Sequence, residues 1–364
     1  MKKIIYHLFA ILQLFADAGT LVNATGSFVN AYTGDTTAFD GTHTMAGELK
    51  TFYDTELLEN ARVEMFYAQF AKRQPLPANH GTTVEWRKWN TFEKASQLQE
   101  GVIPTGQKFG MSTKVGSISQ YGTYAAITDV LEMRAYDDTI LGATEEMGAS
   151  MAETQETLIR DALLVNTNVL YCDNITLATG AVAGTPTTPA EMEASTTVMS
   201  VLSPDMVAKA VTIMKKNRVP TINGKYYAVI HPSVAYDLRK SDAWIEAHKY
   251  AAASEIFNGE IGELHGCRFV ENVFAPVLGG DYKNKAGTVT YATYFFGKDG
   301  FGIIDPEGGA AEMIIKSKEQ AGGPLNQFST VGYKFETNGA TMLYTERVLR
   351  LMSCSSFSGT DEEN

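Results

Sequence analysis

The most sustained hydrophobic pattern in the chain runs from Asp137 to Leu170, a stretch without proline. Apolar or small side chains recur every three or four residues in two adjacent lines, which is typical of a helix with a broad buried face. These positions are Ile140, Thr144, Met147, Met151, Leu158, Ala162, Val165 and Val169, and beside them Leu141, Ala152, Ile159, Leu163 and Leu170. We predict one helix of roughly 50 Å that begins at Asp137 and Asp138 and serves as the spine for other elements.

Two different patterns precede this spine. Gly19 to Met45 is rich in small and polar residues, with Asp35 and Asp40 as its only charges, so it predicts an extended arm that needs a partner surface. Glu48 to Arg73 has a helical period and ends before proline. Its apolar side is Leu49, Phe52, Tyr53, Leu57, Val63, Phe66 and Phe70.

A long hairpin is predicted next. Thr82 to Trp89 alternates in polarity like a strand, and Ser112 to Ile127 is a second β-rich run. The polar residues 90–110 between them are too many for a tight turn, and such loops are usually functional. We expect the hairpin to reach away from its own core, before a short helix over Asp129 to Arg134.

The second half of the chain changes character. Cys172 to Ser200 is predicted to be a linker or an exposed hairpin, because Thr, Ala, Gly and Pro dominate it. Ser203 and Pro204 mark a helix start, with a buried side formed by Met206, Val207, Ala210, Val211 and Met214. Further strands and short helices alternate up to Ile304, which predicts a small α/β lobe. The strands are 226–231, 267–271, 288–296 and 301–304, and the helices are 234–239 and 243–250.

The C-terminal region returns to β patterns. Strands are predicted over Glu312 to Lys318, Thr330 to Glu336 and, as one long element, Ala340 to Ser353. The acidic tail from Gly359 to Asn364 is predicted to be disordered. The whole is an α+β chain, a platform of spine helix and C-terminal strands split by an inserted α/β lobe. We expect Leu158 and Ile159 of the spine to be buried against the last strands, near Met342 and Tyr344.

Composition and charge narrow the class of protein. The 364 residues are 44% hydrophobic, which suits a folded chain with more than one core. The net charge of −12 is opposite to the basic footprint of a general nucleic-acid binder. Three widely spaced cysteines, Cys172, Cys267 and Cys354, favour reduced thiols over a disulfide framework.

The N-terminus allows two interpretations. Lys2 and Lys3 precede an apolar run that ends at Ala16-Asp17-Ala18, as in a secretory signal peptide. Ile5, Leu8, Leu12 and Phe15 also share one helical face, so the segment could instead be an amphipathic docking helix. No other apolar run approaches the length of a membrane span.

Signatures of catalysis are missing from the sequence. It contains no G-x-x-x-x-G-K-[ST], H-E-x-x-H, C-x-x-C or G-x-S-x-G motif. His265 and Cys267 could bind a metal or form a nucleophile pair, but no other His or Cys lies near them in sequence, so we favour a structural role. His231 and His248 sit at the ends of predicted elements without a recognisable partner.

The remaining candidates also favour structural roles. Adjacent carboxylates such as Asp137-Asp138 and Glu145-Glu146 point in different directions on a helix, which suits a cap and a solvated face. Met147 and Met151 on the spine suit core filling. We therefore predict no catalytic, cofactor-binding or metal-binding residues and no enzyme activity. An arm, a long hairpin and a split platform expose surface that neighbouring copies could cover, which indicates an assembly subunit.

Short matches spread in order along nearly the whole chain give a family resemblance. They are Leu12-Gln13-Leu14-Phe15-Ala16-Asp17, Lys50-Thr51-Phe52-Tyr53-Asp54, Glu56-Leu57-Leu58-Glu59-Asn60-Ala61, Gln120-Tyr121-Gly122, His231-Pro232-Ser233-Val234-Ala235-Tyr236-Asp237-Leu238, Asn258-Gly259-Glu260-Ile261-Gly262, Phe269-Val270-Glu271, Pro324-Leu325-Asn326-Gln327 and Thr330-Val331-Gly332. With these the sequence resembles the major capsid (coat) proteins of tailed bacteriophages, which have the Hong Kong ninety-seven type of fold, and among them the N-four-like coat family. Specificity comes from the number and order of the matches, since none is a catalytic motif.

The resemblance implies a division of labour. Residues 1–45 would be the N-terminal arm, 46–80 a helix and 81–128 the extended E-loop hairpin. Residues 129–202 and 305–364 would form the peripheral domain, and 203–304 the axial domain at the five-fold and six-fold axes. Some coats of this fold cross-link a Lys to an Asn; Lys94 and Lys108 lie in the hairpin, but no motif supports that transfer.

The predicted function is that of a structural subunit of the icosahedral head of a tailed phage. It would assemble with itself as hexamers and pentamers in the bacterial host cytoplasm, enclose double-stranded DNA without sequence-specific binding, and meet portal and scaffold or decoration proteins. No membrane or cofactor is expected. The acidic surface, Glu145-Glu146 included, should face outward because packaged phosphate repels it. The alternatives are an encapsulin-like shell around protein cargo and a secreted surface protein.

Overall fold

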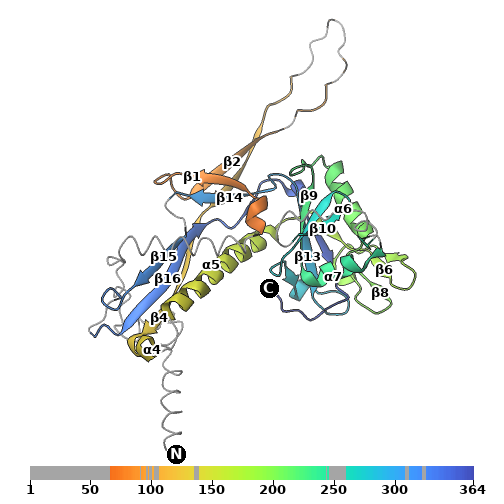
Figure 1. Cartoon of the computed structure of the whole chain (residues 1–364). Coiled ribbons are helices and arrows are strands. Elements are labelled where there is room, and N and C mark those ends of the chain that lie inside the picture. Colours follow the sequence, from red (N-terminus) through yellow and green to blue (C-terminus); the bar gives the residue numbers. More distant parts are fainter. Residues whose placement is uncertain are drawn as a thin grey trace, which may run out of the picture.

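The computed structural model describes residues 66–90, 92–95, 97, 101, 106–134, 139–242, 244–245, 260–307, 311–321 and 325–364. In it, an elongated part built along one long helix joins a rounded lobe, and a hairpin projects from between them (Figure 1). The predictions for the arm, for most of the helix over 48–73 and for most of the helix over 243–250 lie outside the described residues. So do Asp137, Asp138 and His248.

The elongated part pairs the long helix α5 (Thr139–Leu163) with an antiparallel sheet in the order β15-β16-β4. These strands are β15 (Glu312–Lys316), β16 (Phe328–Thr337) and β4 (Ser119–Thr128), and the short helix α4 (Asp129–Arg134) leads from β4 towards α5. Met151 of α5 is 1% exposed and packs in one core with Val331 and Phe335. The predicted spine, its short leading helix and the core role of Met151 are confirmed.

The helix is shorter than its apolar pattern predicts. α5 has 25 residues, or roughly 37 Å at the rise of an α-helix, and the prediction of a helix through Leu170 is wrong. Asn166 and Asn168 donate side-chain hydrogen bonds of 2.6 and 3.0 Å to the carbonyl of Val348. The chain then forms β5 (Val169–Tyr171), which pairs parallel with a C-terminal strand. Tertiary pairing thus overrides the helical period in this segment.

A second sheet of the elongated part has the order β1-β14-β17. It joins β1 (Lys72–Leu76), β14 (Phe301–Pro306) and β17 (Thr341–Met342), and a short helix η2 (Tyr67–Phe70) precedes β1. The prediction that the helix from Glu48 continues to Arg73 is therefore wrong at its end. β1 pairs parallel with β14 and lies at the sheet edge, where a strand tolerates the missing N–H of Pro75.

The lobe is built on a mixed sheet of seven strands in the order β10-β11-β9-β13-β18-β5, with β12 also paired to β13. Its further strands are β9 (Tyr226–Ile230), β10 (Glu260–Leu264), β11 (Cys267–Glu271), β12 (Val277–Leu278), β13 (Thr290–Phe296) and β18 (Val348–Ser353). A short helix η4 (Gly280–Tyr282) lies between β12 and β13. Because β5 and β18 lie in this sheet, the lobe includes segments from both sides of residues 203–304.

Two helices cover one face of this sheet. α6 (Pro204–Lys216) begins at Ser203, whose hydroxyl accepts the backbone N–H of Met206, as the sequence predicts. α7 (Pro232–Lys240) begins at His231, whose ring accepts the N–H of Ser233. The predicted inner side of α6 is confirmed in full, since the same five residues are buried in the core with Ala228.

The segment over Cys172 to Ser200 is not a linker but a small folded sheet, and the alternative prediction of an exposed hairpin agrees with one of its strand pairs. It has the order β7-β6-β8, from β6 (Asn174–Thr176), β7 (Val182–Gly184) and β8 (Val198–Met199), with a short helix η3 (Pro189–Glu191). Met192 and Met199 share a core with Met352 of β18. The composition hid this packing because the few buried side chains and the backbone hydrogen bonds that hold the segment have partners in distant parts of the chain.

The predicted long strand over Ala340 to Ser353 is also divided. β17 belongs to the elongated part, a short helix η5 (Thr345–Arg347) turns the chain, and β18 crosses into the lobe between β13 and β5. Of the two spine residues expected near Met342, Ile159 is 4% exposed and shares a core that Met342 borders. Leu158 is only partly buried and packs in the other core, with Phe335.

A buried carboxylate lies where the two parts meet. Glu156 of α5 is 0% exposed, and its Oε1 accepts the N–H of Phe66 at 3.1 Å, the N–H of Tyr67 at 3.2 Å and the amide of Asn272 at 2.9 Å. Asn272 follows β11 of the lobe. One side chain of the spine helix therefore binds both the segment before η2 and the lobe.

Candidate assembly interface

The two strands of the projecting hairpin are mostly exposed. β2 (Thr83–Trp89) and β3 (Met111–Ser117) pair antiparallel over their whole length, which confirms the predicted hairpin as far as Ser117. The rest of the predicted second β run, up to Ile127, belongs to β4, which pairs with β16 in another sheet. In Figure 1 the hairpin leaves the body between the elongated part and the lobe. The described loop residues 92–95, 97, 101 and 106–109 are exposed.

Trp86 holds the base of the hairpin to the body. Its ring lies where a side chain on Gly116 or Gly302 would be: a Cβ added at these positions would lie 2.8 and 2.9 Å from ring carbons of Trp86. Gly116 belongs to β3 and Gly302 to β14. Two glycines thus make room for an indole that joins the hairpin to the β1-β14-β17 sheet.

Gly116→Val should loosen this base, because the new side chain collides with Trp86 and with the hydroxyl of Thr341 at 2.6 Å. Faster hydrogen–deuterium exchange in 83–89 and 111–117, by about tenfold or more, is the expected result. Gly106→Val is the matched control, since nothing lies within 4 Å of that position in the same hairpin. Equal exchange in both variants would show that Trp86 does not anchor the hairpin.

Three aromatic rings stack on the outer half of the hairpin. The ring centroid of Phe109 lies 4.2 Å from that of Trp89 and 5.3 Å from that of Phe92, at interplanar angles of 17°. The three residues, which we call the aromatic stack, are 61%, 56% and 58% exposed in the order Trp89, Phe92, Phe109. Glu93 and Gln107 hold the two sides of the loop together by backbone–side-chain hydrogen bonds of 2.9 and 3.1 Å.

Such a stack is costly to leave in water. Each ring offers an apolar area that favours burial, and exposed apolar clusters of this kind mark interaction surfaces. Lys94 and Lys108, the two candidates for a cross-link, are also exposed in the hairpin. The arrangement suits a contact with another protein chain.

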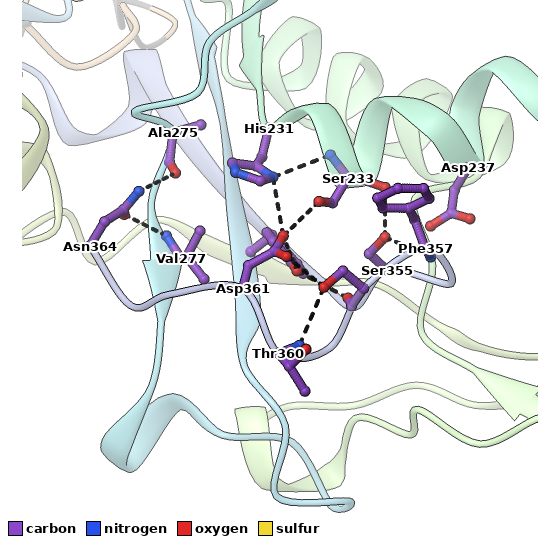
Figure 2. A network of polar contacts seen from close by, with 12 residues as sticks. His231, Ser233, Asp237, Ala275, Val277, Ser355, Phe357, Thr360, Asp361 and Asn364 are labelled. Carbon is purple, nitrogen blue, oxygen red and sulfur yellow. Dashed lines mark hydrogen bonds and ion pairs between the residues drawn. The ribbon is translucent and has the colours of Figure 1, made fainter.

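The C-terminal tail is placed in the structure, contrary to the prediction of disorder for 359–364. Figure 2 shows it folded against the lobe, where Asp361 lies between α7 and β13. The Asp361 carboxylate accepts hydrogen bonds from the hydroxyls of Ser233 at 2.6 Å, Tyr291 at 2.8 Å and Ser358 at 2.5 Å. Asn364 adds three hydrogen bonds: its side chain accepts the N–H of Val277 at 2.9 Å and donates to the carbonyl of Ala275 at 3.5 Å, and its own N–H donates to the carbonyl of Val277 at 3.3 Å. The polar composition of the tail predicted disorder, because the residues that form hydrogen bonds with it lie far away in the sequence.

The tail brings together a serine, a histidine and an aspartate without the geometry of a catalytic triad. The Ser233 hydroxyl donates its hydrogen bond to Asp361, and the Nδ1 atom of His231 accepts the backbone N–H of Ser233 at 3.2 Å. Burial lowers the pKa of His231, against the attraction of Asp361, whose Oδ2 atom is 3.9 Å away. Burial alone would raise the pKa of Asp361, but its hydrogen bonds hold it below the ordinary value. A nucleophilic serine must donate the hydrogen bond of its hydroxyl to the general base. Since this hydroxyl binds the carboxylate instead, the group holds the tail in place.

The other candidates from the sequence are not brought together. His265 is exposed on a turn while Cys267, two residues on, is fully buried, and burial raises the pKa of that thiol well above its usual range. Glu145 and Glu146 are exposed. Within the described residues, no group of three or more His, Cys, Asp or Glu side chains could hold a metal ion. The three cysteines are free thiols, as predicted.

The residues that define this interface are not among the candidates predicted from the sequence. Trp89, Phe92 and Phe109 are large aromatics in an otherwise polar loop, and that contrast was the available signal. Glu156 and the Trp86 anchor gave no such signal, because their partners come from distant segments. In the part of the chain that the structure describes, no helix combines the length and apolar character of a membrane span.

A long-helix platform, a lobe and a projecting apolar hairpin define a subunit that associates through its surfaces. Residues 112–336, more than half of the chain, match the phage capsid protein family, and the chain belongs to that family. A search of curated proteins finds no match. The predicted capsid family thus has independent support.

Solved structures with similar folds are themselves capsids. The capsid structure of the cyanophage P-SCSP1u has a TM-score of 0.55 at 14% identity, over 80% of this chain and 88% of that chain. The capsid of Ralstonia phage GP4 has a TM-score of 0.55 at 13% identity, over 83% and 93%. The capsid of cyanophage Pam1 has a TM-score of 0.56 at 13% identity, over 77% and 87%. The predicted capsid fold is confirmed.

The protein is accordingly a structural subunit of a phage head, and its copies associate into the shell of the virion. The division into arm, E-loop, peripheral domain and axial domain stays a prediction.

Proposed function

We propose that the chain builds an icosahedral head as pentamers and hexamers, in which the β2–β3 hairpin of one copy packs its aromatic stack on the next. The lobe gathers at the symmetry axes and the double-stranded genome fills the interior without sequence-specific contacts. Portal and scaffold or decoration proteins complete the head, which forms in the host cytoplasm. The chain needs no cofactor and has no enzyme activity.

The observation that carries this proposal is the exposed aromatic stack on a projecting hairpin. Because these three residues are each more than half exposed, their rings contribute little to the stability of the isolated subunit. Covering them in a neighbouring copy would remove apolar area from water at about 25 cal/mol per Å², and aromatic anchors of this kind dominate protein interfaces. The acidic balance of the chain supports the expectation that acidic surface such as Glu145-Glu146 faces away from packaged phosphate.

The test replaces the stack and leaves the rest of the hairpin unchanged. Trp89→Ser, Phe92→Ser and Phe109→Ser together should keep the midpoint of thermal unfolding of the unassembled subunit within about 2 °C, because the rings are exposed. The yield of closed shells should fall at least about tenfold, as expected when hot-spot residues are lost. Sedimentation and electron microscopy of the chain, co-expressed with the head genes of its phage, measure this yield.

A conservative variant is the control. Trp89→Phe, Phe92→Leu and Phe109→Leu keep an apolar surface and should restore most of the shells. Normal shells from the triple-serine variant would contradict the proposed role of the hairpin.

A further inference from the structure

A second surface lies where the loop-side end of β2 faces the lobe. Three segments that are distant in sequence line a pocket of about 390 Å³: the end of β2 at 87–89, the residues after α6 at 217–219, and the turn at 344–347. The pocket therefore exists only in the folded chain, and each segment contributes charge to it.

The charge of this pocket is opposite to that of the chain. Arg87, Lys88, Arg218 and Arg347 line it, and Glu346 is the only carboxylate among the lining residues. The chain as a whole carries a net charge of −12. Like charges placed together repel each other. Four cations in one pocket therefore make the local electrostatic potential positive, and this attracts an anion.

Two of the cations are held in place by one tyrosine. The Lys88 ammonium lies 4.4 Å and the Arg347 guanidinium 3.7 Å from the ring centroid of Tyr344, both within cation–π range. Arg347 also donates a hydrogen bond of 3.0 Å to the carbonyl of Lys298. Lys88 lies 3.7 Å from Glu346, an exposed pair of small energetic weight. The cations are thus positioned before any ligand arrives.

Arg218 has no such role inside the chain. It lies in the left-handed region of the backbone with φ of 55°, the usual conformation of a residue that ends a helix, since the N–H of Val219 bonds to the carbonyl of Met214. Its side chain forms no ion pair with any residue that the structure describes, and the residue is exposed. The C-terminal end of α6 attracts cations, but Lys215 and Lys216 already occupy its last turn.

We propose that this basic pocket receives a carboxylate-bearing segment of a neighbouring copy of the chain. Every copy is acidic, so carboxylates are the charges that a neighbour has in excess. Trp89 belongs both to the aromatic stack and to the pocket wall, so a copy that covers the stack also reaches the pocket. The arginine forks bind carboxylates through two parallel hydrogen bonds. This inference rests on the proposed packing of the hairpin between copies.

The first experiment removes charge. Arg87→Gln with Arg218→Gln should leave the unfolding midpoint of the subunit unchanged and lower the yield of closed shells about tenfold, because charge pairs across an interface fix its register. Lys114→Gln with Lys216→Gln is the matched control: it removes one charge from the same hairpin and one from the end of α6, just before Arg218, both outside the pocket lining. Equal yields from the two double variants would overturn the proposal.

The second experiment identifies the occupant. Arg218→Lys supplies an amine, and a carbodiimide then joins that amine to a carboxylate in direct contact. Assembled shells should give covalent dimers on a denaturing gel, and mass spectrometry should join the peptide containing position 218 to an Asp or Glu of another copy. A link confined to Glu346 of the same chain, or no link, would contradict the proposal.

The outcomes also separate this inference from the function on which it rests. If the triple-serine variant of the stack still closes shells, the hairpin packing itself fails. If the stack variant fails to assemble and the pocket variant assembles normally, only the pocket proposal fails. Normal shells that hold less DNA after Arg87→Gln with Arg218→Gln would assign the pocket to phosphate and overturn a protein occupant.

Discussion

Ile159→Ala is expected to lower the free energy of unfolding of the unassembled subunit by about 2–5 kcal/mol, the usual range for a buried Ile truncated in a core. Ile159 is 4% exposed. It lies in the core that joins α5 to the lobe sheet through Val229, Tyr294 and Val348. The cavity would open where the two parts of the molecule meet, so the loss should appear before any assembly.

Leu158→Ala is the matched comparison. Leu158 is the preceding residue of the same helix, but it is only partly buried and packs beside Phe335 in the other core. Its truncation should cost less than that of Ile159, by about 1 kcal/mol or more, because part of its surface is already in water. Chemical denaturation of both variants measures the difference. If Ile159→Ala left stability unchanged, the α5 contact with the lobe would not support the fold.

Elements set by local rules could be predicted from the sequence. Ser203 and Pro204 define the start of α6, and the period of its apolar residues identifies its inner side, because caps and amphipathic stripes act within one helix. The hairpin strands follow from alternation in the same way. The α+β class and the order of the large elements are therefore accessible without the structure.

Elements set by distant partners could not be predicted. Residues 164–170 continue the helical period of the spine, yet β5 pairs with β18, which follows about half a chain later. β1 pairs with β14 in the same manner. The tail is ordered by hydroxyls of α7 and β13, which local composition does not show.

The candidate interface likewise contains residues that could be predicted from the sequence and residues that could not. Exposed aromatics in a polar loop carry a signal in the sequence, and the aromatic stack could have been inferred from it. The basic pocket could not, since 87–89, 217–219 and 344–347 are separate segments whose charges are ordinary until the fold joins them. Neither could the position of Glu156, which is one of several acidic residues on α5.

Glu156 gives the second large expected effect, a stability that depends on pH. Burial raises the pKa of this carboxyl from 4.5 to about 7, although hydrogen bonds from Tyr67, Phe66 and Asn272 and the charge of Arg160 act in the opposite direction. A folded pKa above the unfolded one means that the fold binds the proton more tightly. The associated stability is complete below pH 4.5 and is lost as the pH rises through about 7, for a total of roughly 3 kcal/mol.

Glu156→Gln isolates this contribution. The amide oxygen of glutamine can take the place of Oε1, which accepts all three donors, and the side chain stays neutral at every pH. The difference in free energy of unfolding between wild type and Glu156→Gln should therefore change by roughly 3 kcal/mol from pH 4.5 to pH 8, in favour of the variant at the higher pH. Denaturant titrations of the unassembled subunit across this range measure the difference.

Glu156→Ala separates the charge from the hydrogen bonds. It removes the acceptor and leaves the N–H of Tyr67 and the amide of Asn272 buried without a partner, at about 1–3 kcal/mol for each. The alanine variant should thus be the least stable of the three at pH 5, where the wild-type carboxyl is largely protonated and still accepts both donors. At pH 8 the wild type carries a buried charge and should lie closer to the alanine variant. A difference between wild type and Glu156→Gln that stays constant with pH would show that Glu156 has an ordinary pKa, and that its hydrogen bonds and the charge of Arg160 fully offset the cost of burial.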